Sequence, residues 1–120
     1  MLGLKQGYDV FLSEGAVLKD RYRQELDGWG VPYESEGHDP ARILAANIIV
    51  KSPGIPDSNP VVVRARAEGI PVISEIEFGG WHTDAVKVII SGTNGKTTTT
   101  ALTHAVLKTG GLNVGLAGNI

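Results

Sequence analysis

The chain has 120 residues, of which 42% are hydrophobic and 20% charged, a composition typical of a soluble folded domain rather than a disordered segment. The formal net charge of −2, with no run of Lys or Arg, argues against nucleic-acid binding, and no apolar stretch reaches the roughly 20 residues that cross a bilayer. Cysteine is absent, which excludes disulfides and thiolate chemistry and is compatible with the cytoplasm, where we expect the protein to work.

The N-terminal residues predict the end of a helix followed by a strand. Residues 1–7 resemble the last turns of a helix that stops at Gly7, and the charges of Lys5 and Asp9 come too early for a secretory leader. Residues 8–13 form a short apolar run that predicts a buried strand. Since an open α/β domain usually begins with a strand, we expect one strand to lie upstream of this chain.

Apolar residues then recur at helical spacing. Leu18, Tyr22, Leu26 and Trp29 follow one another at intervals of 4, 4 and 3, so they predict a helix with one buried face. Gly30 fits the position just past that helix, where a positive φ costs glycine little. We therefore expect Trp29 to be a core residue.

Two further helix starts share one chemistry. In Asp39-Pro40 and Asn59-Pro60 a side-chain oxygen can cap free N–H groups, and proline suits the first helical turn. The other elements expected in this half are an edge strand, two strands and a short helix, at residues 31–33, 47–52, 70–74 and 75–81.

From residue 86 the pattern is strand, loop, helix and strand. Residues 86–90 predict a strand, 96–109 a helix and 112–116 a further strand. Strands that alternate with helices at this spacing predict an α/β class with parallel sheets covered on both faces. We expect two domains, 1–84 and 85–120, both incomplete.

The loop before the last helix, SGTNGKTTTT at residues 91–100, has the composition of a phosphate pocket. Gly92 and Gly95 let the backbone turn tightly and aim N–H groups inward, and the positive end of the next helix favours anions. Lys96 adds a full charge that can reach terminal phosphates, and the Thr97 hydroxyl can hold a magnesium ion. The loop therefore predicts nucleotide binding.

A threonine-rich connection without a ligand is the alternative interpretation. The full G-x-x-x-x-G-K-[ST] pattern needs a glycine at position 90, which is Ile here. Against this, four threonines each lower helix stability by roughly a few tenths of a kcal/mol, a cost that charge-assisted hydrogen bonds to phosphate can offset. Because GxxGKT falls where a strand becomes a helix, nucleotide binding is favoured.

Other reactive side chains show weaker patterns. Ser13 and Ser91 lack an obvious His–Asp arrangement, so a serine hydrolase is not expected. The residues interpreted as surface, packing or helix-dipole groups, rather than as metal ligands or an acid–base pair, are His38, His82, His104, Glu75 and Glu77.

Together with its flanking segments, the loop resembles the Mur ligases, whose shorter phosphate loop reads GT-N/H-GKT. SPGIP at 52–56, GIPVISEIEF at 69–78 and GGLNVGLAGNI at 110–120 are similar to the member of that family that adds D-glutamate. The resemblance covers essentially all 120 residues and rests on three separated motifs.

The resemblance implies a three-domain, monomeric, cytoplasmic enzyme of peptidoglycan synthesis. Such an enzyme joins D-glutamate to UDP-N-acetylmuramoyl-L-alanine with ATP and Mg²⁺, through an acyl phosphate, and releases ADP and phosphate. Residues 1–84 would be a Rossmann-like domain for the UDP-linked substrate that lacks its first strand. Residues 85–120 would begin the ATP-binding, P-loop central domain.

The same resemblance assigns roles to individual residues. Lys96 would neutralise charge on the β- and γ-phosphates as the catalytic group, and Thr97 would be a magnesium ligand. The ATP-binding loop comprises Gly92, Thr93, Asn94, Gly95, Lys96, Thr97 and Thr98. The positions matched to contacts with the UDP-linked substrate are Ser52, Pro53, Gly54, Asn119 and Glu14, the last beside Ser13.

The family's carbamylated lysine, its metal-binding glutamate and histidine, and its third domain are expected beyond Ile120. The absent first strand should lie mid-sheet, so the strands near Val10 and Ile49 would lack their shared neighbour. We therefore expect the isolated chain to be poorly stable and inactive. Two alternatives stay open: another Mur-type or folylpolyglutamate-type ligase, against which SPGIP and EIEF argue, and a non-catalytic nucleotide-binding module.

Overall fold

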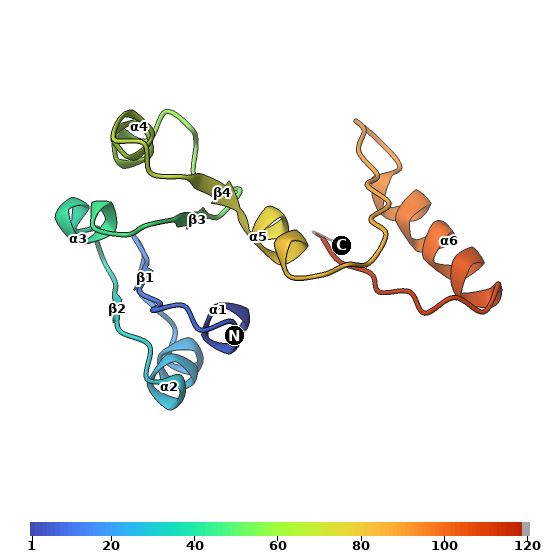
Figure 1. The fold of residues 1–120 in the computed structure, drawn as a ribbon, viewed down its shortest axis with the longest axis horizontal. Coiled ribbons are helices and arrows are strands. Elements are labelled where there is room, and N and C mark those ends of the chain that lie inside the picture. Colours follow the sequence, from blue (N-terminus) through green and yellow to red (C-terminus); the bar gives the residue numbers. More distant parts are fainter. Residues whose placement is uncertain (119–120) are drawn as a thin grey trace. The chain divides into compact units, whose positions relative to one another are not determined.

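The computed structural model describes residues 1–118 and divides into two compact units, the first spanning Met1–His82 and the second beginning at Thr83. The helices and strands are labelled in Figure 1. The first unit contains α1 (Leu2–Lys5), β1 (Leu12–Ser13), α2 (Asp20–Trp29), β2 (Tyr33–Glu34), α3 (Pro40–Leu44), β3 (Ile49–Lys51), α4 (Pro60–Ala67), β4 (Val72–Ser74) and α5 (Glu75–Trp81). The described part of the second contains α6 (Lys96–Thr109).

Two small parallel sheets lie in the first unit. β1 pairs with β2, with Leu12 opposite Tyr33, and β3 pairs with β4, with Val50 opposite Ile73. Helices α2 and α4 connect the strands of each pair, as parallel pairing requires, because a tight hairpin can join only antiparallel strands. The predicted α/β class is confirmed.

In the described chain β1 and β3 belong to different sheets. The N–H of Leu12 donates to Pro32 in the direction of β2, and that of Ile49 donates to Pro71 in the direction of β4. Alternate residues of β1 and β3 therefore point their backbone groups away from these partners. No described strand lies between β1 and β3, and the expectation of a strand upstream of this chain stays a prediction.

Local capping explains why two of the helices start where they do. Asp39 Oδ1 accepts a hydrogen bond from Ala41 N at 3.0 Å, and Asn59 Oδ1 accepts one from Val61 N at 2.9 Å. Proline follows each cap, as the sequence predicts. Gly30 ends α2 with φ of 66°, so the predicted glycine stop is also confirmed.

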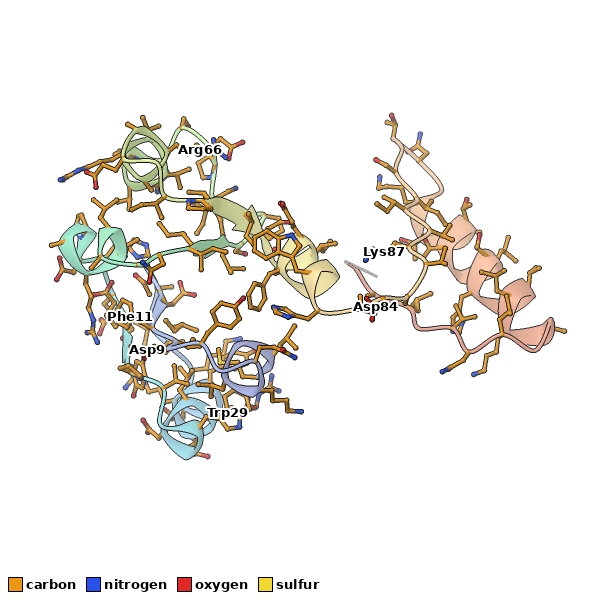
Figure 2. The ribbon with its side chains drawn as sticks, viewed as in Figure 1. Asp9, Phe11, Trp29, Arg66, Asp84 and Lys87 are labelled. Atoms are coloured by element: carbon orange, nitrogen blue, oxygen red, sulfur yellow. The ribbon has the colours of Figure 1, made fainter. Side chains whose placement is uncertain are left out.

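The hydrophobic core of the first unit is small. Leu18, Leu26 and Val31 are its buried members around β1 and β2. Trp29, predicted to be a core residue, is 46% exposed, so that prediction is wrong. The reason is its surroundings: Trp29, labelled in Figure 2, lies with Tyr22 in the lining of an open cavity of about 1400 Å³, and other lining residues come from both sheets.

Helix α6 dominates the second unit and has the predicted bounds, with Gly111 at φ 83° after its end. The strands predicted at 86–90 and 112–116 are wrong, because residues 83–118 contain no hydrogen-bonded strand. A strand is defined by a ladder to a neighbour, and neither segment has one here. Val86 is accordingly 95% exposed. None of the described helices combines the length and apolar character needed to cross a bilayer.

Candidate functional site

The loop at 91–95 leads directly into α6. Gly92 has φ of 153° and Gly95 has φ of 75°, values that would strain any residue with a side chain. Gly95 caps the helix without a side-chain hydrogen bond, so the first-turn amides of Lys96, Thr97 and Thr98 have no capping group. These exposed N–H groups lie at the positive end of a 14-residue helix, where an anion is favoured.

The Lys96 ammonium group lies over the same loop. Its Nζ donates to the carbonyl oxygen of Gly92 and, at 3.2 Å, to that of Thr93. The side chain therefore folds back across the turn instead of extending into solvent. The ammonium group and the first-turn amides belong to one short segment, so this loop gathers a full positive charge and several N–H donors at the start of α6.

The threonines at the start of α6 differ in what their hydroxyl groups do. Thr100 Oγ1 donates to the Lys96 carbonyl at 2.7 Å, the usual back-bond of a threonine inside a helix. Thr97 and Thr98 are exposed in the first turn. Across residues 1–118, no group of three or more His, Asp or Glu side chains could hold a metal ion. A hydroxyl such as that of Thr97 suits a magnesium ion that takes its other ligands from phosphate and water.

At the carboxyl ends of β1 and β2, three polar side chains meet. Ser13 Oγ lies 2.6 Å from Glu34 Oε1 and 2.6 Å from His38 Nδ1. A hydroxyl has one proton and an ionised carboxylate only accepts, so Ser13 donates to Glu34, and His38 Nδ1–H donates to Ser13. The bond from Ser13 lowers the pKa of Glu34, helped by the Asp39 N–H at 3.0 Å and the positive charge of Arg42.

Sequence reasoning missed this cluster, since it found no His–Asp partner for Ser13. The structure supplies a histidine and an acid, but the serine lies between them, so the acid does not orient the imidazole as in a nucleophilic triad. Gly15 allows the close approach, because a Cβ there would lie 2.9 Å from His38 Nε2. One signal was available: Ser13 ends one predicted strand and Glu34 directly follows another, and the carboxyl ends of parallel strands share an edge.

Glu14, the predicted residue next to Ser13, forms a hydrogen bond with its own loop. Its Oε1 accepts a hydrogen bond from Ala16 N at 2.9 Å, which closes the loop after β1. The side chain is exposed, and Ser13, Glu14 and Ser52 all line the 1400 Å³ cavity. Predicted residues near the ends of β1 and β3 therefore line one open cavity.

The predicted Ser52-Pro53-Gly54 segment forms an exposed turn after β3. Ile55 N donates to the Ser52 carbonyl at 3.1 Å, which closes the turn. Gly54 has no positive φ, and a Cβ on it would meet nothing within 4 Å. The fold itself therefore does not require glycine at position 54, and the open backbone leaves room for a ligand. Asn119, the remaining predicted position, lies outside the described residues.

Comparison with known proteins finds close relatives along the whole chain, although no family model matches it. The 120 residues are 50% identical to the UDP-N-acetylmuramoylalanine--D-glutamate ligase of Bacteroides fragilis. They are 48% identical to the ligase of the same name from Porphyromonas gingivalis and 45% identical to that of Christiangramia forsetii. Each match covers 100% of this chain and 27% of the relative, so the chain spans about a quarter of the length of these relatives.

Proposed function

The chain is homologous over its full length to D-glutamate ligases of the Mur family, and we propose that it forms the substrate- and ATP-binding part of such an enzyme. The intact enzyme would join D-glutamate to UDP-N-acetylmuramoyl-L-alanine in the cytoplasm, as a monomer. Residues 1–84 would form a Rossmann-like domain for the UDP-linked substrate. Residues 85–120 would begin the P-loop domain that binds ATP.

The observation that carries this proposal is the arrangement of residues 92–98. Two glycines with positive φ, the free first-turn amides and the Lys96 ammonium group surround one short loop. These groups fit the polyphosphate of ATP, which supplies the phosphoryl group that activates the substrate carboxylate. In this role Lys96 would neutralise phosphate charge, and the Thr97 hydroxyl would hold Mg²⁺. Positioning and charge neutralisation of this kind account for most of the catalysis in phosphoryl transfer.

The uridine nucleotide is assigned to the first unit. Ligands of open parallel sheets bind beyond the carboxyl ends of the strands; there Ser13 ends β1, Glu14 follows it, and the Ser52–Gly54 turn follows β3. Their exposed polar groups and open backbone suit a nucleotide. Asn119 is assigned to the diphosphate of the same substrate.

Replacing Lys96 tests the proposal. In the full-length protein, Lys96→Ala should lower ADP release that depends on both D-glutamate and the UDP-linked acceptor by about 10²- to 10³-fold. Lys108→Ala is the matched control, because Lys108 is an exposed lysine in the last turn of the same helix. An unchanged rate in Lys96→Ala would contradict the proposal.

The amino-acid dependence of the wild-type rate separates the alternatives. A sister Mur-type or folylpolyglutamate-type ligase would release ADP with a different amino acid or acceptor. A non-catalytic module would bind ATP without turnover under any of these conditions. Of these possibilities, only the proposed function predicts a rate of ADP release that depends on D-glutamate.

A further inference from the structure

Three charged side chains form a cluster at the loop that follows β3. Lys51 Nζ lies 3.5 Å from Asp57 Oδ1, and Arg66 Nη2 donates to the same oxygen at 3.0 Å. Lys51 ends β3 and Asp57 belongs to the loop, while Arg66, labelled in Figure 2, lies near the end of α4. One carboxylate therefore joins two cations from different elements, and both cations hold the pKa of Asp57 below its ordinary value, Arg66 more strongly than Lys51.

Lys51 also bonds directly to the turn. Its Nζ donates to the carbonyl of Ile55 at 2.5 Å, while Ile55 N donates to the carbonyl of Ser52 at 3.1 Å. Lys51, which directly precedes the turn in the chain, therefore also bonds to Ile55, the residue that closes it. Its side chain is only 16% exposed, so its interactions are less screened by water than those of an ordinary surface lysine.

The other ion pairs of the described chain are of a different kind. Arg21–Glu25 and Arg64–Glu68 are exposed pairs one helical turn apart. Such pairs stabilise their own helix by about 0.2–0.5 kcal/mol and constrain nothing else. Among the salt bridges of residues 1–118, those that join separate elements are the two at Asp57.

We propose that Lys51, paired with Asp57, which Arg66 also binds, is a positioning residue that orders the Ser52–Gly54 turn for the uridine nucleotide. This inference rests on the proposed function. The turn has an open tip, since a Cβ on Gly54 would meet nothing within 4 Å, and the residue after the tip, Ile55, is bonded by Lys51. A backbone that is ordered before binding loses less entropy when the ligand arrives. The cluster also carries one more positive than negative charge, which favours an approaching diphosphate.

Steady-state kinetics on the full-length protein test the inference. Lys51→Met keeps much of the length of the side chain but removes its charge and donors, so the KM for the UDP-linked acceptor should rise about tenfold. The kcat and the KM for ATP should stay within about twofold, because the lysine acts on substrate binding and not on the chemical step. Lys51→Arg should recover most of the loss, since it restores a donor and a positive charge.

A matched pair of arginines on α4 supplies the control. Arg66→Gln removes the second cation of the cluster and should raise the acceptor KM about two- to fivefold. Arg64→Gln removes an exposed arginine of the same helix that pairs only with Glu68 and should leave all constants unchanged. The inference is overturned if Lys51→Met leaves the acceptor KM unchanged, or if Arg64→Gln raises it as much as Arg66→Gln does.

Hydrogen exchange separates failure of this inference from failure of the proposed function. In the full-length protein without ligands, the Ile55 and Asn59 amides should exchange faster in Lys51→Met than in the wild type, and Arg64→Gln should not change them. If the wild type shows no D-glutamate-dependent turnover, the proposed function fails, and binding of uridine diphosphate by wild type and Lys51→Met then decides the positioning role. Equal affinity or equal exchange in the two proteins overturns it.

Discussion

The Ser13 hydroxyl donates to the Glu34 carboxylate over 2.6 Å, although the two residues are 21 positions apart in the sequence. They lie opposite each other in the β1–β2 ladder and are the last residues of their strands. The bond therefore joins two strand ends at the edge where the uridine nucleotide is proposed to bind. The bond also favours the ionised form of Glu34, so the stability of the fold depends on the charge of this side chain.

Glu34→Gln should change how stability depends on pH. The hydrogen bond from Ser13 is the main reason that the pKa of Glu34 is lowered from its ordinary value of 4.5. A carboxylate with a lowered folded-state pKa stabilises the fold fully above pH 4.5, and this contribution is lost as the pH falls through the folded-state pKa. In urea titrations of the full-length protein, Glu34→Gln should therefore unfold more easily at pH 7 and lose less stability below pH 4.5.

Ser13→Ala supplies the second arm of that experiment. It removes the largest cause of the lowered pKa and leaves the carboxylate in place. Its unfolding free energy should show the same shallower fall below pH 4.5. If both variants keep the wild-type slope, the Ser13–Glu34 bond does not persist in solution.

Gly28→Ala and Gly30→Ala should have opposite effects on stability, although they lie two residues apart. Gly28 is inside α2, where a Cβ would meet nothing within 4 Å, so alanine should stabilise the fold by about 0.5–1 kcal/mol. Gly30 has φ of 66°, so alanine there should destabilise it by about 1–2 kcal/mol. Urea unfolding of the full-length protein measures both, and effects of the same sign would contradict the assigned end of α2.

Features set by neighbouring residues could be predicted from the sequence. The caps at Asp39 and Asn59, the glycine stop at Gly30 and the bounds of α6 all depend on side chains within a few positions. The strands at 86–90 and 112–116 could not, because a strand needs a partner and the described residues supply none beside them. The exposure of Trp29 was missed for the same reason, because helical spacing predicts which side chains share one face of a helix but not whether another element packs against that face.

The candidate site likewise contains features that the sequence predicts and contacts that it does not. The loop around Gly95 and Lys96 is one continuous segment, so its glycines and its lysine could be predicted from their spacing. The Ser13–Glu34–His38 cluster spans 25 residues and the Asp57–Arg66 contact spans 9, so both depend on the tertiary fold. Spacing along the sequence contains no information on such contacts until the strands are paired.

Gly95→Ala and Gly54→Ala should separate the two proposed ligand sites. Gly95 has φ of 75°, so a side chain distorts the loop, and the KM for ATP should rise at least about tenfold. Gly54 has neither a positive φ nor a close neighbour, so Gly54→Ala should leave the unfolding free energy and the KM for ATP unchanged. Its KM for the UDP-linked acceptor should rise, because the new methyl group occupies the space assigned to the nucleotide. If Gly54→Ala raised the KM for ATP instead, the assignment of the uridine nucleotide to this turn would be contradicted.

The isolated 120-residue chain should be weakly stable and should not catalyse ligation. Its buried hydrophobic residues in the described range are Leu18, Leu26, Val31, Val62, Ala65 and Ile73. A core of this size offsets little of the conformational entropy of folding, roughly 1–2 kcal/mol per ordered residue, and both sheets keep unpaired strand edges. Calorimetry should therefore show a broad transition of low enthalpy, and dyes that bind exposed apolar surface should bind the chain at room temperature. A sharp cooperative transition together with D-glutamate-dependent ADP release by these 120 residues would show that neither the open edges nor the small core limits the fold.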